Sequence, residues 1–143
     1  MALRSDRVIQ AVIFDLDNTL TDFLKYKEKS IAAAVDAMVD VGLQPDDVLL
    51  VSTGRKVYEA AHTVLPPLPG VRVAPTIGGH NEPEPWYQPN EITRTVAAKV
   101  GGLPAFLNAP ALPGAELRRS LQTDKSIQRV FAMWREARCA VIG

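Results

Sequence analysis

Two carboxylates one residue apart are the first side chains in this sequence that could do chemistry. Asp15 and Asp17 directly follow an apolar run in the stretch VIFDLDNTLTD. Adjacent carboxylates repel each other and attract a hard cation such as Mg²⁺, and a carboxylate can attack a phosphoryl group. Both residues are therefore candidate metal ligands and catalytic residues, with Asp15 as nucleophile and Asp17 as proton donor. An ordinary turn after a strand is the alternative for an isolated pair of this kind.

A second candidate site is the stretch STGRK, at residues 52–56. It joins the end of an apolar run to the start of a helical pattern, where backbone N–H groups can bind an anion. Arg55 and Lys56 would add positive charge, and simple capping by Thr53 is the alternative. Asn108 lies at the end of a later apolar run. The candidate phosphate-binding residues are Ser52, Thr53, Gly54, Arg55, Lys56 and Asn108.

Alternating strands and helices must position these side chains. Apolar runs rich in β-branched residues predict strands, and residues at helical spacing separate each run from the next. Buried strands joined by helices indicate an α/β fold, a Rossmann-like three-layer sandwich. We expect a five-stranded parallel sheet of order 3-2-1-4-5, with the flavodoxin-like order 2-1-3-4-5 as the alternative. The expected strands are residues 8–14, 47–53, 71–77, 104–110 and 139–143.

Length and composition narrow the class of protein. The 143 residues suit a single domain spanning 1–143. Lys plus Arg and Asp plus Glu both number 16, so we expect no broad attraction to nucleic acid or to a membrane surface. A single cysteine and the lack of an apolar leader or spanning run predict a cytoplasmic protein. We expect a monomer, or a dimer formed through an exposed edge of the last strand.

The first segment, residues 8–43, resembles the opening motif of the haloacid dehalogenase superfamily, an apolar strand followed by D-x-D-x-T. The resemblance implies Asp15 as nucleophile, Asp17 as general acid or base, and Mg²⁺ as cofactor. It also implies an acidic pair after the fourth strand, where this chain has FLNAPALPG and no carboxylate. We therefore expect only weak Mg²⁺ binding and favour a chain that is not an enzyme.

The longer segment, residues 47–143, is similar to the first half of the sugar-binding domain of SorC-type transcriptional regulators. The similar features are a strand followed by Ser-x-Gly-Arg and a helix, a strand ending in Gly-Gly, and an Asn-Glu-Ile helix ending in Gly-Gly. The run ELRRSL, then SIQRVF, then AVIG follows in order. The resemblance implies a phosphorylated sugar as ligand at the strand ends. No DNA-binding segment accompanies it, so we expect no nucleic-acid partner.

Two resemblances in one chain lead to a combined interpretation. We expect an engineered or recombined chimera, with residues 1–44 of dehalogenase type and residues 45–143 of SorC type. Such a chain would lack an intact active site and retain weak binding of phosphate or a phosphorylated sugar. Two alternatives stay open. One is a Mg²⁺-dependent phosphohydrolase that uses Asp15, and the other is a sugar-phosphate effector module of a transcriptional regulator.

Overall fold

The computed structural model describes residues 42–143, together with residues 33, 37 and 40. Asp15, Asp17 and the strand expected at residues 8–14 lie outside the described residues. The described strands form one parallel sheet of order β3-β2-β1-β4. They are β1 (Val48–Val51), β2 (Arg72–Pro75), β3 (Leu103–Pro104) and β4 (Cys139–Val141).

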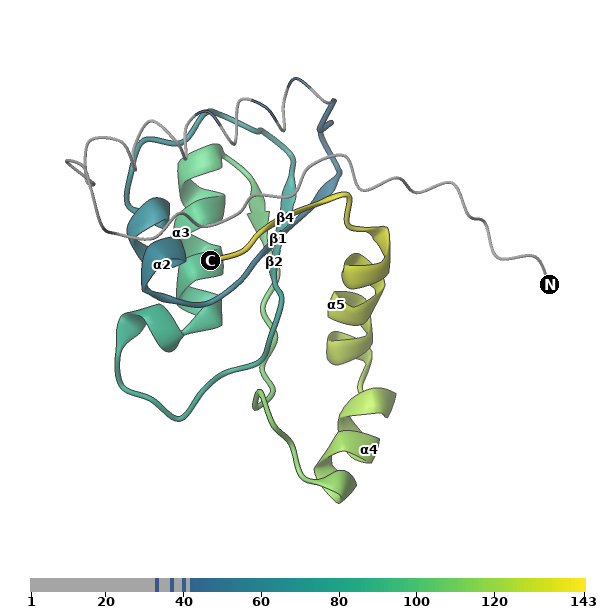
Figure 1. Cartoon of the computed structure of the whole chain (residues 1–143). Helices are drawn as coiled ribbons and strands as arrows, with labels where there is room; N and C mark the ends of the chain where they lie inside the picture. The colour runs from purple at the N-terminus through teal and green to yellow at the C-terminus, as the bar shows by residue number, and fades with distance from the viewer. Residues whose placement is uncertain (1–32, 34–36, 38–39, 41) are drawn as a thin grey trace.

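Helices cover both faces of this sheet (Figure 1). Helices α2 (Arg55–Ala61) and α3 (Pro89–Val100) lie on one face, and α5 (Lys125–Glu136) lies on the other. The 3-10 helix η1 (Pro85–Tyr87) precedes α3, and α4 (Ala115–Thr123) precedes α5. The predicted α/β class with a parallel sheet and three layers is confirmed for this part of the chain.

The core follows the alternation of side chains along the strands, because successive residues of a strand point to opposite faces. Leu49 and Val73 pack in the cluster that contains Ile92 of α3. Their neighbours Val48 and Ala74 pack in a second cluster with Met133 of α5. Burial on both faces explains why these strands are continuous apolar runs.

The expected order 3-2-1-4-5 correctly places residues 71–77 beside residues 47–53, because β2 pairs with β1, but both expected orders are wrong about the strand on the other side of β1. They separate residues 47–53 from residues 139–143, whereas β1 and β4 pair directly, with Leu49 opposite Cys139. The observed order arises because the chain changes its direction across the sheet after β3. Right-handed crossovers through α2 and α3 carry it from β1 to β3 along one face. The return through α5 lies on the other face and ends on the far side of β1.

Proline and glycine lie at or near the ends of two helices. Helix α2 ends at Ala61, ahead of Pro66. Helix α3 begins at Pro89, with Gln88 as N-cap, so Asn90 lies inside the helix. Gly101 ends α3 in the left-handed conformation with φ 72°, as its position in the sequence predicts.

A carboxylate caps helix α5. Asp124 Oδ1 accepts hydrogen bonds from the backbone N–H groups of Ser126 at 2.8 Å and Ile127 at 3.1 Å, and from the Ser126 hydroxyl. These hydrogen bonds, that from the Ser126 side chain first, hold the pKa of Asp124 below its ordinary value. The ionised carboxylate therefore favours the folded helix.

Replacing Leu49 with alanine should destabilise the protein by about 2 to 5 kcal/mol, because a fully buried side chain leaves a cavity in the core. Leu49 is 2% exposed, whereas Leu112 is 93% exposed. The matched variant Leu112→Ala should change the free energy of unfolding by less than about 0.5 kcal/mol. Urea unfolding followed by circular dichroism measures both, and equal losses would contradict the burial described for Leu49.

Acid should remove the contribution of the Asp124 cap. A carboxyl group whose pKa is lower in the folded state stabilises the fold above its unfolded pKa, and this stability is lost as pH falls through the folded pKa. The side-chain amide of the variant Asp124→Asn can still cap the helix but does not titrate. The stability difference between wild type and variant should therefore shrink between about pH 5 and pH 2. Urea unfolding of both proteins across that range tests this. A stability difference that stays constant with pH would contradict it.

Candidate functional site

The turn after β1 and the first two residues of α2, here called the turn of residues 52–56, carry five of the six residues predicted to bind phosphate. Ser52 continues the pairing of β1, since its N–H donates to Val141 O of β4 at 2.9 Å. Its hydroxyl accepts a hydrogen bond from Gly143 N at 3.3 Å and donates to Thr53 O at 3.2 Å. The turn therefore lies against the carboxyl end of β4. Phosphate binding by these residues stays a prediction.

Gly54 shapes this turn and ties it to a distant segment. Its φ of 121° and ψ of 154° lie in a region that only glycine adopts readily. Its N–H donates to Trp86 O of η1 at 2.8 Å, so this N–H is already used within the protein.

Arg55 is the most accessible cation of the turn, with its side chain 74% exposed. It forms an ion pair with Glu59 at 3.0 Å and lies over the Trp86 ring at 5.8 Å from the centroid. Lys56 is the second residue of α2. An exposed ion pair of this kind is weak, so Arg55 could exchange Glu59 for an anionic ligand at little cost.

Asn108 lies apart from this group. It follows β3, and β2 lies between β1 and β3 in the sheet. The side-chain carbonyl of Asn108 accepts a hydrogen bond from Asn90 Nδ2 at 3.1 Å, while Asn90 Oδ1 accepts from Leu107 N at 3.0 Å. These contacts fix the segment after β3 to helix α3, which gives Asn108 a structural role.

A contact between two loops was missed by the sequence analysis. After β2, Gly79 N donates to Ala109 O at 2.8 Å, and Ala111 N donates to Gly79 O at 2.8 Å. A Cβ on Gly78 would lie 2.3 Å from Ala109 O, so no other residue fits there. The Gly-Gly pair in the sequence was the available signal, because glycine allows two backbone segments to approach closely.

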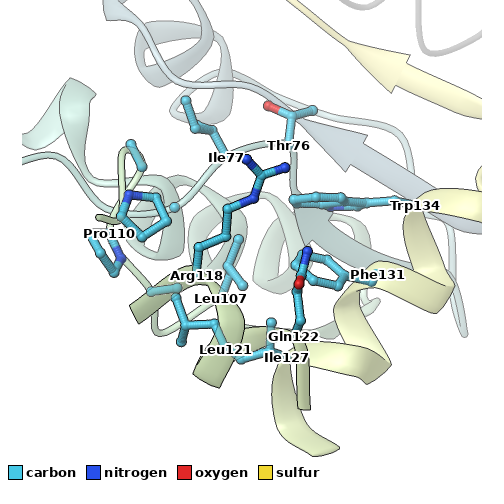
Figure 2. Close-up of a pocket in the computed structure, with 14 residues that line it drawn as sticks. Thr76, Ile77, Leu107, Pro110, Arg118, Leu121, Gln122, Ile127, Phe131 and Trp134 are labelled. Atoms are coloured by element: carbon cyan, nitrogen blue, oxygen red, sulfur yellow. The ribbon is translucent and has the colours of Figure 1, made fainter. Parts of the chain in front are cut away.

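A groove lies beside this loop contact, on the α5 side of the sheet (Figure 2). Its volume is about 240 Å³, and it is lined by the loops after β2 and β3 and by α4 and α5. The side chains of Leu107, Leu121, Ile127, Phe131 and Trp134 make it largely apolar, and Thr76, Arg118 and Gln122 are the polar side chains in its wall.

Metal binding by the aspartates cannot be located on this structure, because Asp15 and Asp17 lie outside the described residues. Within residues 42–143, no three His, Cys, Asp or Glu side chains gather into a group that could hold a metal ion. The Mg²⁺ site at Asp15 and Asp17 stays a prediction. No helix in the described part of the chain is long and apolar enough to cross a membrane.

The family model described as a putative sugar-binding domain matches residues 10–143 of this chain. The chain belongs to this family. No curated protein matches it at a significant level.

Solved structures share the fold of this putative sugar-binding domain. One is the putative sugar-binding domain of a transcriptional repressor from Vibrio fischeri, with a TM-score of 0.63, 26% identity, and coverage of 88% of this chain and 47% of that chain. Another is a putative SorC family transcriptional regulator from Enterococcus faecalis, with a TM-score of 0.70, 22% identity, and coverage of 82% and 48%. A third is the full-length sorbitol operon regulator SorC from Klebsiella pneumoniae, with a TM-score of 0.65 and 22% identity. The match covers 85% of this chain and 40% of that chain.

The putative sugar-binding domain described here thus spans half or less of the length of these structures. The sequence resemblance of residues 47–143 to a sugar-binding domain is confirmed. The interpretation as a chimera without an intact active site is wrong, because one family model runs from residue 10 through the junction expected near residue 44. The same match places Asp15 and Asp17 inside the sugar-binding family, and nothing supports the dehalogenase resemblance.

Substituting alanine for Gly54 should destabilise the protein by about 1 to 3 kcal/mol, because alanine is strained at this backbone conformation. Gly114 offers a matched control, since its φ is −61° and a Cβ there would meet open space. Gly114→Ala should change stability by less than about 1 kcal/mol. Thermal unfolding of both variants measures this, and a neutral Gly54→Ala would show that the turn does not hold the conformation described.

Proposed function

We propose that this chain is the effector-binding domain of a transcriptional regulator and that its ligand is a sugar or a phosphorylated sugar. The observation that carries the proposal is the family match over residues 10–143. The solved structures of similar fold support it, because all three named above are regulators or domains of regulators by description. The proposal replaces the chimera as the main interpretation.

The topology favours one location for the ligand. In open α/β sheets, ligands bind outside the carboxyl ends of the strands, where the winding of the chain reverses. Among the described strands, β2 and β4 flank β1, and their connecting helices cover opposite faces. The reversal therefore falls between β1 and β4, and the turn of residues 52–56 lies there.

The side chains of the turn suit a phosphorylated sugar. Hydroxyls such as those of Ser52 and Thr53 both donate and accept hydrogen bonds, as sugar hydroxyls do. The planar guanidinium of Arg55 can bind two oxygens of a phosphate at once. Gly54 has no side chain to hold a ligand away from the backbone. In the proposed complex, Arg55 gives up its exposed pair with Glu59 and binds the phosphate.

Thermal unfolding with a panel of sugar phosphates and their unphosphorylated sugars tests the proposal. A ligand that binds only the folded protein stabilises it by RT ln(1 + [L]/Kd), about 2.7 kcal/mol at a hundred times Kd. We expect at least one sugar phosphate to raise the melting temperature in a saturable way, and its parent sugar to do so less. If no sugar or sugar phosphate in the panel raises the melting temperature of the protein, the proposal is contradicted.

Arg55→Ala should weaken binding of the stabilising sugar phosphate about tenfold or more, because a charged hydrogen bond to phosphate is lost. Arg94 provides a closely matched control. It also pairs with a glutamate of its own helix, Glu91, and also lies over an aromatic ring, Phe106, at 5.1 Å. Calorimetric titration should show wild-type affinity for Arg94→Ala, and equal losses in both variants would argue against a site at the turn.

A further inference from the structure

The groove on the α5 side has an aromatic wall that is held in place before any ligand binds. Trp134 Nε1 donates a hydrogen bond to Pro75 O, at the end of β2, at 2.7 Å. The Phe131 and Trp134 rings lie 4.9 Å apart between centroids and are tilted by 42°. A wall fixed in this way binds a flat ring without first losing side-chain freedom.

Helix α4 forms the opposite wall and has no buried residue. Leu121 and Gln122 lie three and four residues after Arg118, so all three share one face of this helix. That face is turned to the groove, since all three residues line it. In Figure 2 the Arg118 side chain extends from α4 toward Thr76 and Ile77.

The polar side chains of the groove have no partners within the described part of the protein. No hydrogen bond or ion pair joins the Arg118 guanidinium, the Thr76 hydroxyl or the Gln122 side-chain amide to another described residue. These groups contrast with Arg55, Arg72 and Arg94, each of which pairs with a glutamate. An unpaired cation above an apolar floor is an arrangement that an anion with an apolar body would complete.

We propose that this groove is a second binding site, for a small aromatic carboxylate or sulfonate. The ring lies against Phe131 and Trp134, and the anionic group binds Arg118, with Thr76 and Gln122 as further hydrogen-bond partners. The volume of about 240 Å³ lies below the roughly 300 to 1,000 Å³ usual for drug-sized ligands, so it restricts the site to a small molecule. The site is independent of the sugar-phosphate site proposed at residues 52–56, which involves none of the residues that line the groove.

Titration with 1-anilinonaphthalene-8-sulfonate, an aromatic sulfonate, tests the site in the full chain. We expect saturable binding that Arg118→Gln weakens about tenfold or more. Arg119→Gln is the matched control, because Arg119 neighbours Arg118 on α4 but does not line the groove. The uncharged N-phenyl-1-naphthylamine should bind both variants equally. Equal affinity of the dye for the two variants would overturn the proposal.

Energy transfer from tryptophan locates the bound dye. The chain has two tryptophans, so Trp86→Phe leaves Trp134 as the only donor, and its emission should fall as the dye binds. If the variant is folded and binds the dye but the Trp134 emission does not fall, the proposed location of the site is wrong. If Trp86→Phe does not fold, the comparison of Arg118→Gln with Arg119→Gln still decides.

Competition defines the ligand class. The dye should be displaced by 3-phenylpropanoate more effectively than by 3-phenylpropan-1-ol, which lacks the charge, or by glucose 6-phosphate, which lacks the ring. Stronger displacement by glucose 6-phosphate would overturn the aromatic preference. None of these results depends on whether a sugar phosphate binds at the turn, so the two proposals fail separately.

Discussion

The pairing of β4 with β1 is the constraint on which the rest of this structure depends. Because β1 already has β2 as its parallel neighbour on one side, the chain must leave by one face of the sheet and return by the other. That return places α5 opposite α2 and α3, and it brings the end of β4 against Ser52. The proposed sugar-phosphate site and the groove therefore share an origin in one strand pairing.

Local sequence patterns predicted where most strands and helices lie, but only one of the strand pairings, that of β1 with β2. Apolar runs around Leu49 and Val73 showed where strands lie, and residues at helical spacing between the runs showed that helices connect them. Strand order depends on contacts between residues far apart in the sequence, such as Leu49 with Cys139, and periodicity contains no information about them. The strand expected at residues 104–110 is also wrong in its bounds, because β3 has only two residues, Leu103–Pro104, and the pairing with β2 that defines it does not follow from the apolar run.

The candidate site, like the fold, was predicted from the sequence only in part. The turn of residues 52–56 was found because its residue types and order suit an anion. The geometry of this turn was not predicted, because it depends on a hydrogen bond from Gly54 N–H to Trp86 O of η1, which lies far along the sequence. Asn90 has the preferences of a helix cap, yet its amide bridges to Leu107 and Asn108 because tertiary contacts outweigh local preference. The groove needs α4, α5 and two loops together, so no single stretch indicates it.

The short strand β3 also affects how readily separate protein molecules associate through the edge of the sheet. It lies at one edge of the described sheet. Two apolar side chains are exposed there, Leu103 within β3 at 61% and Phe106 shortly after it at 36%. The N–H groups of Leu103 and Ala105 point inward and donate to β2 and the residue before it. The residue between them is Pro104, which has no N–H to offer on the outer side. An incoming strand therefore finds no donor there, and this edge resists the sheet growth that leads to aggregation.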